Sequence, residues 1–238
     1  MIGSFHLSPR LQSIANEVLR GTVVADVGID HAYLPVWLLC EGIVSSAIGT
    51  DLREGPLERA KQTAVRYGVP NRISLRLCDG LSAISPEEAE YITIAGMGGE
   101  TIANILEQAQ WTKVGQHVLL LQPMSSQEDL RKYLTEHGYI IEKEILSREG
   151  DTIYLTLRVC AGKSAPYSLA EQWVGRQEQG MASPLRLSYL DQTIHRLSRA
   201  LSGLSLAWQS QQKVREAEYR LALEGIKMLR EEWIVWQR

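Results

Sequence analysis

Strand-like and helix-like patterns alternate along the first 138 residues of this 238-residue chain, and this alternation constrains its fold more than any other feature. Short apolar runs are separated by segments in which apolar residues recur at helical spacing. Such an order predicts parallel strands joined by right-handed helical crossovers. We expect strands at 22–28, 46–51, 73–78, 91–95 and 117–122, with a leading helix after Ser8-Pro9 and helices at 56–67, 100–109 and 126–137.

The last two strand-like segments are arranged differently. The segments near 139–147 and 152–160 flank the sequence Ser-Arg-Glu-Gly-Asp, a connection short enough for a β-hairpin. This pair is therefore expected to be antiparallel. The sequence predicts an α/β fold whose mostly parallel sheet ends in an antiparallel hairpin.

The first expected strand ends at one glycine and two acids, which are Asp26, Gly28 and Asp30. A dinucleotide-binding turn uses three glycines that let backbone N–H groups approach a pyrophosphate. Here the carboxylates would repel phosphate. A ligand with hydroxyls, an amino group and a positive centre suits the site better, and S-adenosyl-L-methionine (SAM) carries these groups. Two alternatives stay open: Asp30 could cap the following helix, and Asp26 could bond a neighbouring loop.

Acids also follow the next two expected strands. Ligands in open α/β sheets bind beyond the carboxyl ends of the strands. Asp51 lies 23 residues after Gly28, where a carboxylate can take both hydroxyls of a ribose. Asp79 is placed to accept a hydrogen bond from an adenine amino group. We therefore expect the cofactor to contact Asp26, Gly28, Asp51, Leu52, Asp79, Gly80, Ala95 and Gly96.

The stretch Gly96-Met97-Gly98-Gly99 follows the fourth expected strand. Glycines there would let a planar substrate lie close to the backbone and to a methyl donor. The alternative is a tight strand-to-helix turn in which Met97 fills a gap. The Asn/Asp-Pro-Pro-aromatic motif of many enzymes that methylate the adenine amino group is absent from this stretch.

Together these segments resemble the bacterial TrmK family, whose members use SAM to methylate N1 of adenosine-22 in tRNA. The resemblance runs in continuous order from about Leu7 to Val159, and Met124 departs from it, because the family more often has Asn there. It implies the Rossmann-like fold of class I SAM-dependent methyltransferases, which agrees with the predicted sheet. The segments that carry it are residues 25–35, 55–57, 79–81, 94–99 and 121–123.

The resemblance also implies roles in catalysis. Asp30 matches a catalytic acid or base, and a carboxylate near N6 could bind the amino group and take its proton as charge develops. Neutral N1 already has a lone pair and the SAM methyl group is already activated, so no metal is expected. His31 could help to shape the pocket for the target base; the alternative is that it is simply exposed to solvent and has no role in the site. Expected contacts to the target base are His31, Tyr33, Met97, Gly98, Gly99, Gln122 and Pro123.

The C-terminal part carries two heptad patterns. A helix start at Ser183-Pro184 precedes apolar residues spaced four and three apart, and the rhythm returns after the segment 206–214. We predict an α-helical coiled-coil hairpin, as in the family's C-terminal domain, with a linker at 161–168. The domains are then 1–162, which binds SAM, and 163–238. The seam residues are Leu190, Ile194, Leu197, Leu201, Leu204, Tyr219, Ala222, Ile226, Leu229, Trp233 and Trp236.

The net charge of −3 is divided unevenly between these parts. Residues 1–162 hold 14 Lys/Arg and 20 Asp/Glu, for a balance of −6, whereas residues 163–238 hold 11 and 8, for a balance of +3. A basic appendage could bind a polyanion such as tRNA. The alternatives are a solvated helical surface and a hairpin that serves only stability or dimerisation.

Further features exclude other classes of protein. With no apolar run of 18 residues and no signal-like N-terminus, we expect a cytoplasmic protein with no membrane partner, and we favour a monomer. Cys40, Cys78 and Cys160 lack the paired spacing of a zinc site and are interpreted as buried free thiols. Two rival functions remain: a SAM-dependent methyltransferase acting on another RNA base or a small molecule, and a non-catalytic SAM-binding scaffold.

Overall fold

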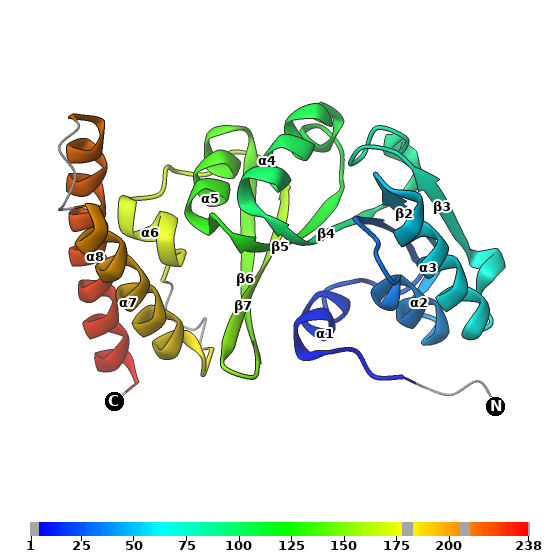
Figure 1. Ribbon diagram of the computed structural model, residues 1–238, viewed down its shortest axis with the longest axis horizontal. Helices are drawn as coiled ribbons and strands as arrows, with labels where there is room; N and C mark the ends of the chain where they lie inside the picture. Colours follow the sequence, from blue (N-terminus) through cyan, green and yellow to red (C-terminus); the bar gives the residue numbers. More distant parts are fainter. Residues whose placement is uncertain (1–4, 178–182, 205–209, 238) are drawn as a thin grey trace.

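A seven-stranded sheet forms the centre of the computed structural model, which describes residues 5–177, 183–204 and 210–237 (Figure 1). The strand order is β3-β2-β1-β4-β5-β7-β6. Strands β1 to β5 run parallel, and β7 lies antiparallel to both β5 and β6. This confirms the predicted sheet. The strands are β1 Thr22–Val27, β2 Val44–Asp51, β3 Ile73–Leu77, β4 Tyr91–Gly98, β5 Val118–Ser125, β6 Tyr139–Glu149 and β7 Thr152–Ala161.

The strand order reverses between β1 and β4. From β1 the chain moves outward through β2 and β3, and it then returns to the other side of β1 to form β4 and β5. The loops that leave β1 and β4 therefore diverge, which opens a crevice at the carboxyl ends of the strands. The fold places the ends of β1, β2 and β4 around this crevice.

Helices cover both faces of the sheet. One core packs α4 and α5 against Ala25 and Ile92, and the other packs α1, α2 and α3 against Val24. Because β1 is buried on both faces, its sequence is a continuous apolar run interrupted only by Asp26. The helices are α1 Pro9–Ala15, α2 Tyr33–Cys40, α3 Glu54–Arg66, α4 Gly99–Gln108, α5 Gln127–Glu136, α6 Leu169–Val174, α7 Arg186–Leu204 and α8 Ser210–Trp236, with short 3-10 turns at Pro70–Arg72, Pro86–Glu88 and Gln110–Lys113.

Strands β4 and β5 extend about three residues beyond their predicted ends. The pairing continues through Met97 with Pro123 and Gly98 with Ser125, after an irregularity in register. Glycine and proline are depleted in strands, so the sequence pattern stops before the pairing does. The extension carries residues 96–98 to the rim of the crevice.

The C-terminal helices α6, α7 and α8 pack together beside the β6–β7 hairpin, at the end of the molecule opposite β3 (Figure 1). Their core includes Trp173, Leu190 and Ile226, and it reaches Ile153 on β7. Trp233 is buried as predicted, but Trp236 is 39% exposed because it lies near the end of α8. The predicted seam residue Leu204 lies outside the side chains that are described. The helices are present, and the coiled-coil geometry stays a prediction.

A buried arginine joins these helices to the sheet domain. Arg131 of α5 donates to Glu144 of β6 at 2.7 and 3.0 Å and to the carbonyl of Trp173 at 3.0 Å. It also donates to the hydroxyl of Tyr189 on α7 at 3.2 Å. Because the Arg131 side chain is fully buried, removing a partner would leave an uncompensated charge.

Three further observations bear on the sequence predictions. Within the described residues, no helix is long and apolar enough to cross a bilayer, and no group of three His, Cys, Asp or Glu side chains is arranged to hold a metal. The three cysteines are free, but none is buried: Cys40 is exposed because it ends α2, and Cys78 and Cys160 are half-buried.

Candidate active site

Two cavities open in the crevice at the carboxyl ends of the strands, and Gly28 lines both of them. We call the first the β2 cavity; its volume is about 540 Å³ and it lies over the ends of β2 and β3. The second, the β1 cavity, measures about 350 Å³ and is walled by the loop that follows β1. Of the predicted residues, Asp51, Leu52, Asp79, Gly80 and Met97 line the β2 cavity, and Asp26, Asp30, His31, Tyr33, Ala95 and Gly96 line the β1 cavity.

In the β2 cavity, two carboxylates come from neighbouring parallel strands. Asp51 ends β2 with a side chain only 11% exposed, and its Oδ1 accepts the backbone N–H of Arg53 at 3.0 Å. Asp79 is exposed on the loop after β3. Gly80 is buried with a φ of +52°, and a Cβ there would come within 2.9 Å of Ile105. A fixed acid and an exposed acid therefore face one cavity, which suits a ligand rich in hydroxyl and amino groups.

In the β1 cavity, Asp26 is the buried acid. It is 7% exposed, and its Oδ1 accepts a hydrogen bond from Thr93 Oγ1 at 2.5 Å. Burial raises the pKa of Asp26 to about 7, although the hydrogen bond from Thr93 acts in the opposite direction. A cationic group of a ligand would favour the ionised form of this carboxyl.

The loop after β1 has an unusual backbone that exposes Asp30. The φ angles of Gly28, Asp30 and Ala32 are +73°, +43° and +56°, in the left-handed region. The cap of α2 is Ala32, so Asp30 does not cap that helix. Instead its Oδ1 accepts a hydrogen bond from Arg59 Nη2 of α3 at 2.7 Å. With 63% of the Asp30 side chain exposed, this carboxylate stands at the rim of the cavity.

Two rings stand next to Asp30. The rings of His31 and Tyr33 are stacked, with centroids 5.4 Å apart and planes within 10°. Phe5 approaches Tyr33 at 6.0 Å between centroids. The His31 side chain is 43% exposed and Tyr33 is 46% exposed. Half-exposed rings at the rim of a cavity can contact a planar base.

The glycines of residues 96–99 serve different purposes. Gly96 has a φ of +79° and open space where a Cβ would stand, so the backbone is accessible from the β1 cavity. A Cβ on Gly99 would lie 2.1 Å from the carbonyl oxygen of Ser126. A glycine is therefore needed at position 99, because the backbone of the loop between β5 and α5 comes too close to leave room for a side chain. The methyl group of Met97 packs against Gly28, so that a Cβ on Gly28 would lie 2.3 Å from that methyl carbon. The tight turn and the gap filled by Met97 are therefore present, and the approach of a planar substrate to the open Gly96 stays a prediction.

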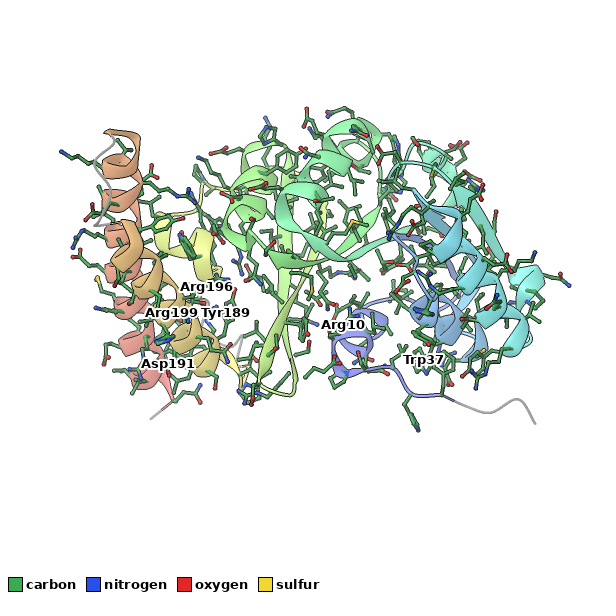
Figure 2. All side chains as sticks on the ribbon, in the orientation of Figure 1. Arg10, Trp37, Tyr189, Asp191, Arg196 and Arg199 are labelled. Carbon is green, nitrogen blue, oxygen red and sulfur yellow. The ribbon has the colours of Figure 1, made fainter. Side chains whose placement is uncertain are left out.

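The structure does not bring every predicted contact into the cavities. Gln122 is fully buried; its amide donates to Thr156 Oγ1 at 2.9 Å and to the carbonyl of Arg10 at 3.0 Å. Its side-chain oxygen accepts from Arg10 Nη1 at 3.2 Å. Pro123 is also buried, and neither residue lines the β1 or the β2 cavity. The predicted contacts Gly98 and Gly99 do not line these two cavities either. Gln122 instead positions Arg10, which does line the β1 cavity and is labelled in Figure 2.

Sequence reasoning missed several side chains of this site, among them Arg10, Arg59 and Thr93. Arg10 lies in the first turn of the leading helix, and Arg59 is half-buried on α3. Thr93 is hidden within the apolar strand β4. Each of them bonds a residue that lies 29 or more positions away in the sequence, and Arg59 with Asp30 is the pair with the smallest separation. No local pattern indicates such contacts.

Comparisons with known proteins agree with this geometry. The family model described as "Methyltransferase domain" matches residues 7–157. The tRNA (adenine(22)-N(1))-methyltransferase of Bacillus subtilis is 39% identical over 156 residues, which are 66% of this chain and 66% of that protein.

Two solved structures extend the similarity over almost the whole chain. The crystal structure of the B. subtilis M1A22 tRNA methyltransferase TrmK matches with a TM-score of 0.84 and 31% identity, and covers 95% of this chain and 100% of that one. The structure of M. capricolum TrmK in complex with the cofactor product S-adenosyl-homocysteine matches with a TM-score of 0.73 and 25% identity, over 97% and 99% of the two chains.

Proposed function

The chain belongs to the TrmK family of SAM-dependent tRNA methyltransferases, and from this premise we propose that it transfers a methyl group from SAM to N1 of adenosine-22 in tRNA. One observation carries the proposal. Two cavities meet at Gly28: the residues of the β2 cavity suit the nucleoside part of the cofactor, and those of the β1 cavity suit its methionine part and a planar base. Groups held in the two cavities come together at this glycine.

The donor set of the crevice fits SAM. The Asp51 carboxylate offers two acceptors for the ribose hydroxyls, and Asp79 offers one for the adenine amino group. Leu52, which is 65% exposed, offers an apolar surface beside them. Asp26, buried in the β1 cavity, suits the α-ammonium of the methionine part. When bound, SAM supplies a methyl group that its positive sulfur already activates.

The residues of the β1 cavity then handle the target base. We propose that Asp30, held at the rim by Arg59, accepts a hydrogen bond from the adenine amino group. Methylation at N1 makes the ring cationic, so the carboxylate stabilises the charge that develops and can take the amino proton. His31 and Tyr33 would contact the face of the base after it leaves its helix. The protein contributes placement and electrostatics.

Two rival functions predict different substrates. A methyltransferase of another base or of a small molecule would need the same cofactor residues, and a scaffold would need no target cavity beside them. The similarity to tRNA methyltransferases favours tRNA, and this substrate places the reaction in the cytoplasm. We further propose that residues 1–162 hold the catalytic site, that 163–238 form a helical unit that contacts tRNA, and that the protein acts as a monomer without a metal.

Transfer of label from methyl-tritiated SAM to a tRNA transcript tests the proposal. We expect incorporation into a transcript with adenosine at position 22 and background counts with a transcript that carries guanosine there. The Asp30→Asn protein should bind SAM and transfer little label. Equal labelling of the two transcripts would exclude adenosine-22 as the target, and labelling of neither would exclude tRNA methylation.

A further inference from the structure

A third cavity lies between α7, the end of β5 and the start of β7, and we call it the α7 groove. Its volume is about 550 Å³. Figure 2 labels Tyr189, Asp191, Arg196 and Arg199 on the helix that forms one wall. The opposite wall comes from the end of β5 and the turn of the β6–β7 hairpin. Lining residues that matter here are Met124, Gln127, Thr152, Gln192, Arg196 and Arg199.

The wall formed by α7 is positively charged. Arg196 and Arg199 are exposed and three positions apart, so they are neighbours on one helix face with Gln192. Among the described residues, neither arginine has an ion pair; Arg196 only lies over the ring of Trp173 at 5.3 Å. The one acid in the groove, Asp191, is paired with Arg230 at 2.5 Å. Two guanidinium groups are therefore available to an anionic ligand.

The groove lies at the same edge of the sheet as the β1 cavity. Met124, which is 48% exposed, stands at the end of β5 in the groove. The neighbouring strand β4 pairs with β5 through Gly98 and Ser125, and it carries Gly96 in the β1 cavity. The hairpin turn is also fixed to α7, because Gln192 donates to the carbonyl of Asp151 at 3.2 Å. The end of β5 separates the two openings.

We propose that the α7 groove binds the sugar-phosphate backbone of the tRNA strand that flanks the flipped adenosine, with Arg196 and Arg199 each contacting a phosphate. The inference rests on the proposed function, because it supposes an RNA substrate at the β1 cavity. Guanidinium groups bind phosphate through two parallel N–H donors. Phosphate contacts fix the position of a nucleic acid without reading its sequence. The groove therefore holds the tRNA in place, while the β1 cavity takes the base.

The double variant Arg196→Gln and Arg199→Gln tests this role in the full-length protein. We expect its Kd for tRNA to rise about 10- to 100-fold at about 0.15 M salt. The slope of log affinity against log salt should become shallower by about two units, because two phosphate contacts are lost. The Kd for SAM should equal that of the wild type. The melting temperature should fall only slightly, because both arginines are exposed and the variant loses only the contact of Arg196 with the ring of Trp173.

Lys61→Gln with Arg66→Gln is the matched control, because it removes two exposed cations from α3, away from α7. This control should bind tRNA and show a salt slope like the wild type. If the α7 variant kept the wild-type affinity for tRNA and the wild-type salt slope, the groove would not be a phosphate site. The same conclusion would follow if the α3 control lost as much tRNA affinity as the α7 variant. Failure of the proposed function would look different, because the wild-type protein itself would then leave adenosine-22 unmethylated.

Discussion

The buried carboxyl of Asp26 makes SAM binding dependent on pH. Its pKa in the free protein is about 7, because burial disfavours the ionised form. At pH 6 only about one molecule in ten is then ionised, whereas at pH 8 about nine in ten are. If Asp26 pairs with the α-ammonium of SAM, the protein must release a proton when it binds SAM at low pH. The affinity should therefore rise about fivefold from pH 6 to pH 8. Ionisation of Asp26 contributes about tenfold, and deprotonation of the α-amino group of SAM, whose ordinary pKa is about 8, removes about half of that gain at pH 8.

Calorimetry in buffers of different ionisation enthalpy measures both quantities. We expect close to one proton released for each SAM bound at pH 6. At pH 8 we expect a net uptake of about half a proton, because Asp26 is already ionised and the α-amino group of SAM must be protonated to pair with it. The Asp26→Asn variant keeps the shape of the side chain and loses the titrating group. Its affinity should be about 10- to 100-fold lower at pH 7.5, as expected for a lost charge-assisted hydrogen bond, and it should lack the rise between pH 6 and 7.5. Identical pH profiles for the two proteins would remove Asp26 from the cofactor site.

The raised pKa of Asp26 also predicts how the stability of the SAM-free protein depends on pH. Because the pKa of Asp26 in the folded protein, about 7, exceeds its ordinary value of 3.8, Asp26 favours the folded state below pH 4, and this contribution is lost as pH rises through 7. A difference of about three pKa units corresponds to about 4 kcal/mol. Without SAM, Asp26→Asn should therefore be more stable than the wild type at pH 8, in urea unfolding. A variant that is less stable at pH 8 and equally pH-dependent would contradict the raised pKa.

Three other predictions concern single residues. Asp51→Ala should weaken SAM binding by roughly 1.5–3 kcal/mol, about ten- to a hundredfold, and an unchanged Kd in calorimetry would exclude Asp51 from the ribose site. Asp30→Asn should retain SAM binding while single-turnover methylation falls about a hundredfold or more, and equal rates would leave Asp30 without a catalytic role. Gly99→Ala should destabilise the protein by about 1–3 kcal/mol, because its Cβ would lie 2.1 Å from the Ser126 carbonyl oxygen. The control Gly203→Ala, in open space on α7, should be neutral or stabilising, and equal melting temperatures for the two variants would show that the turn tolerates a side chain.

The fold could be predicted from sequence because its strands are periodic and its connections short. All seven strands lie where apolar runs indicate them, and the hairpin follows from the short turn before Thr152. The acids Asp26, Asp51 and Asp79 could be grouped in advance, because the carboxyl ends of parallel strands meet at one edge. The position of a residue at the carboxyl end of a strand is therefore enough to predict that it borders the crevice, even when its side-chain contacts are unknown.

Side-chain contacts across the chain could not be predicted in the same way. Gln122 is expected at the end of its strand, but it lies within β5, and its amide faces Arg10 and Thr156 in the interior because residues of a strand alternate between two faces. Arg59 meets Asp30 only because α3 packs beside the loop after β1. The raised pKa of Asp26 depends on its burial between neighbouring strands, and this too requires the assembled fold.

Mass spectrometry of the reaction product shows whether this protein methylates N1 of adenosine-22 in tRNA. Unmodified tRNA is incubated with SAM and the wild-type protein or the Asp30→Asn variant, then cut into defined fragments and nucleosides. We predict 1-methyladenosine in the wild-type reaction alone, in the fragment that contains position 22. Methylation at another position, a methyl group on the amino nitrogen, or equal product from Asp30→Asn would contradict the account.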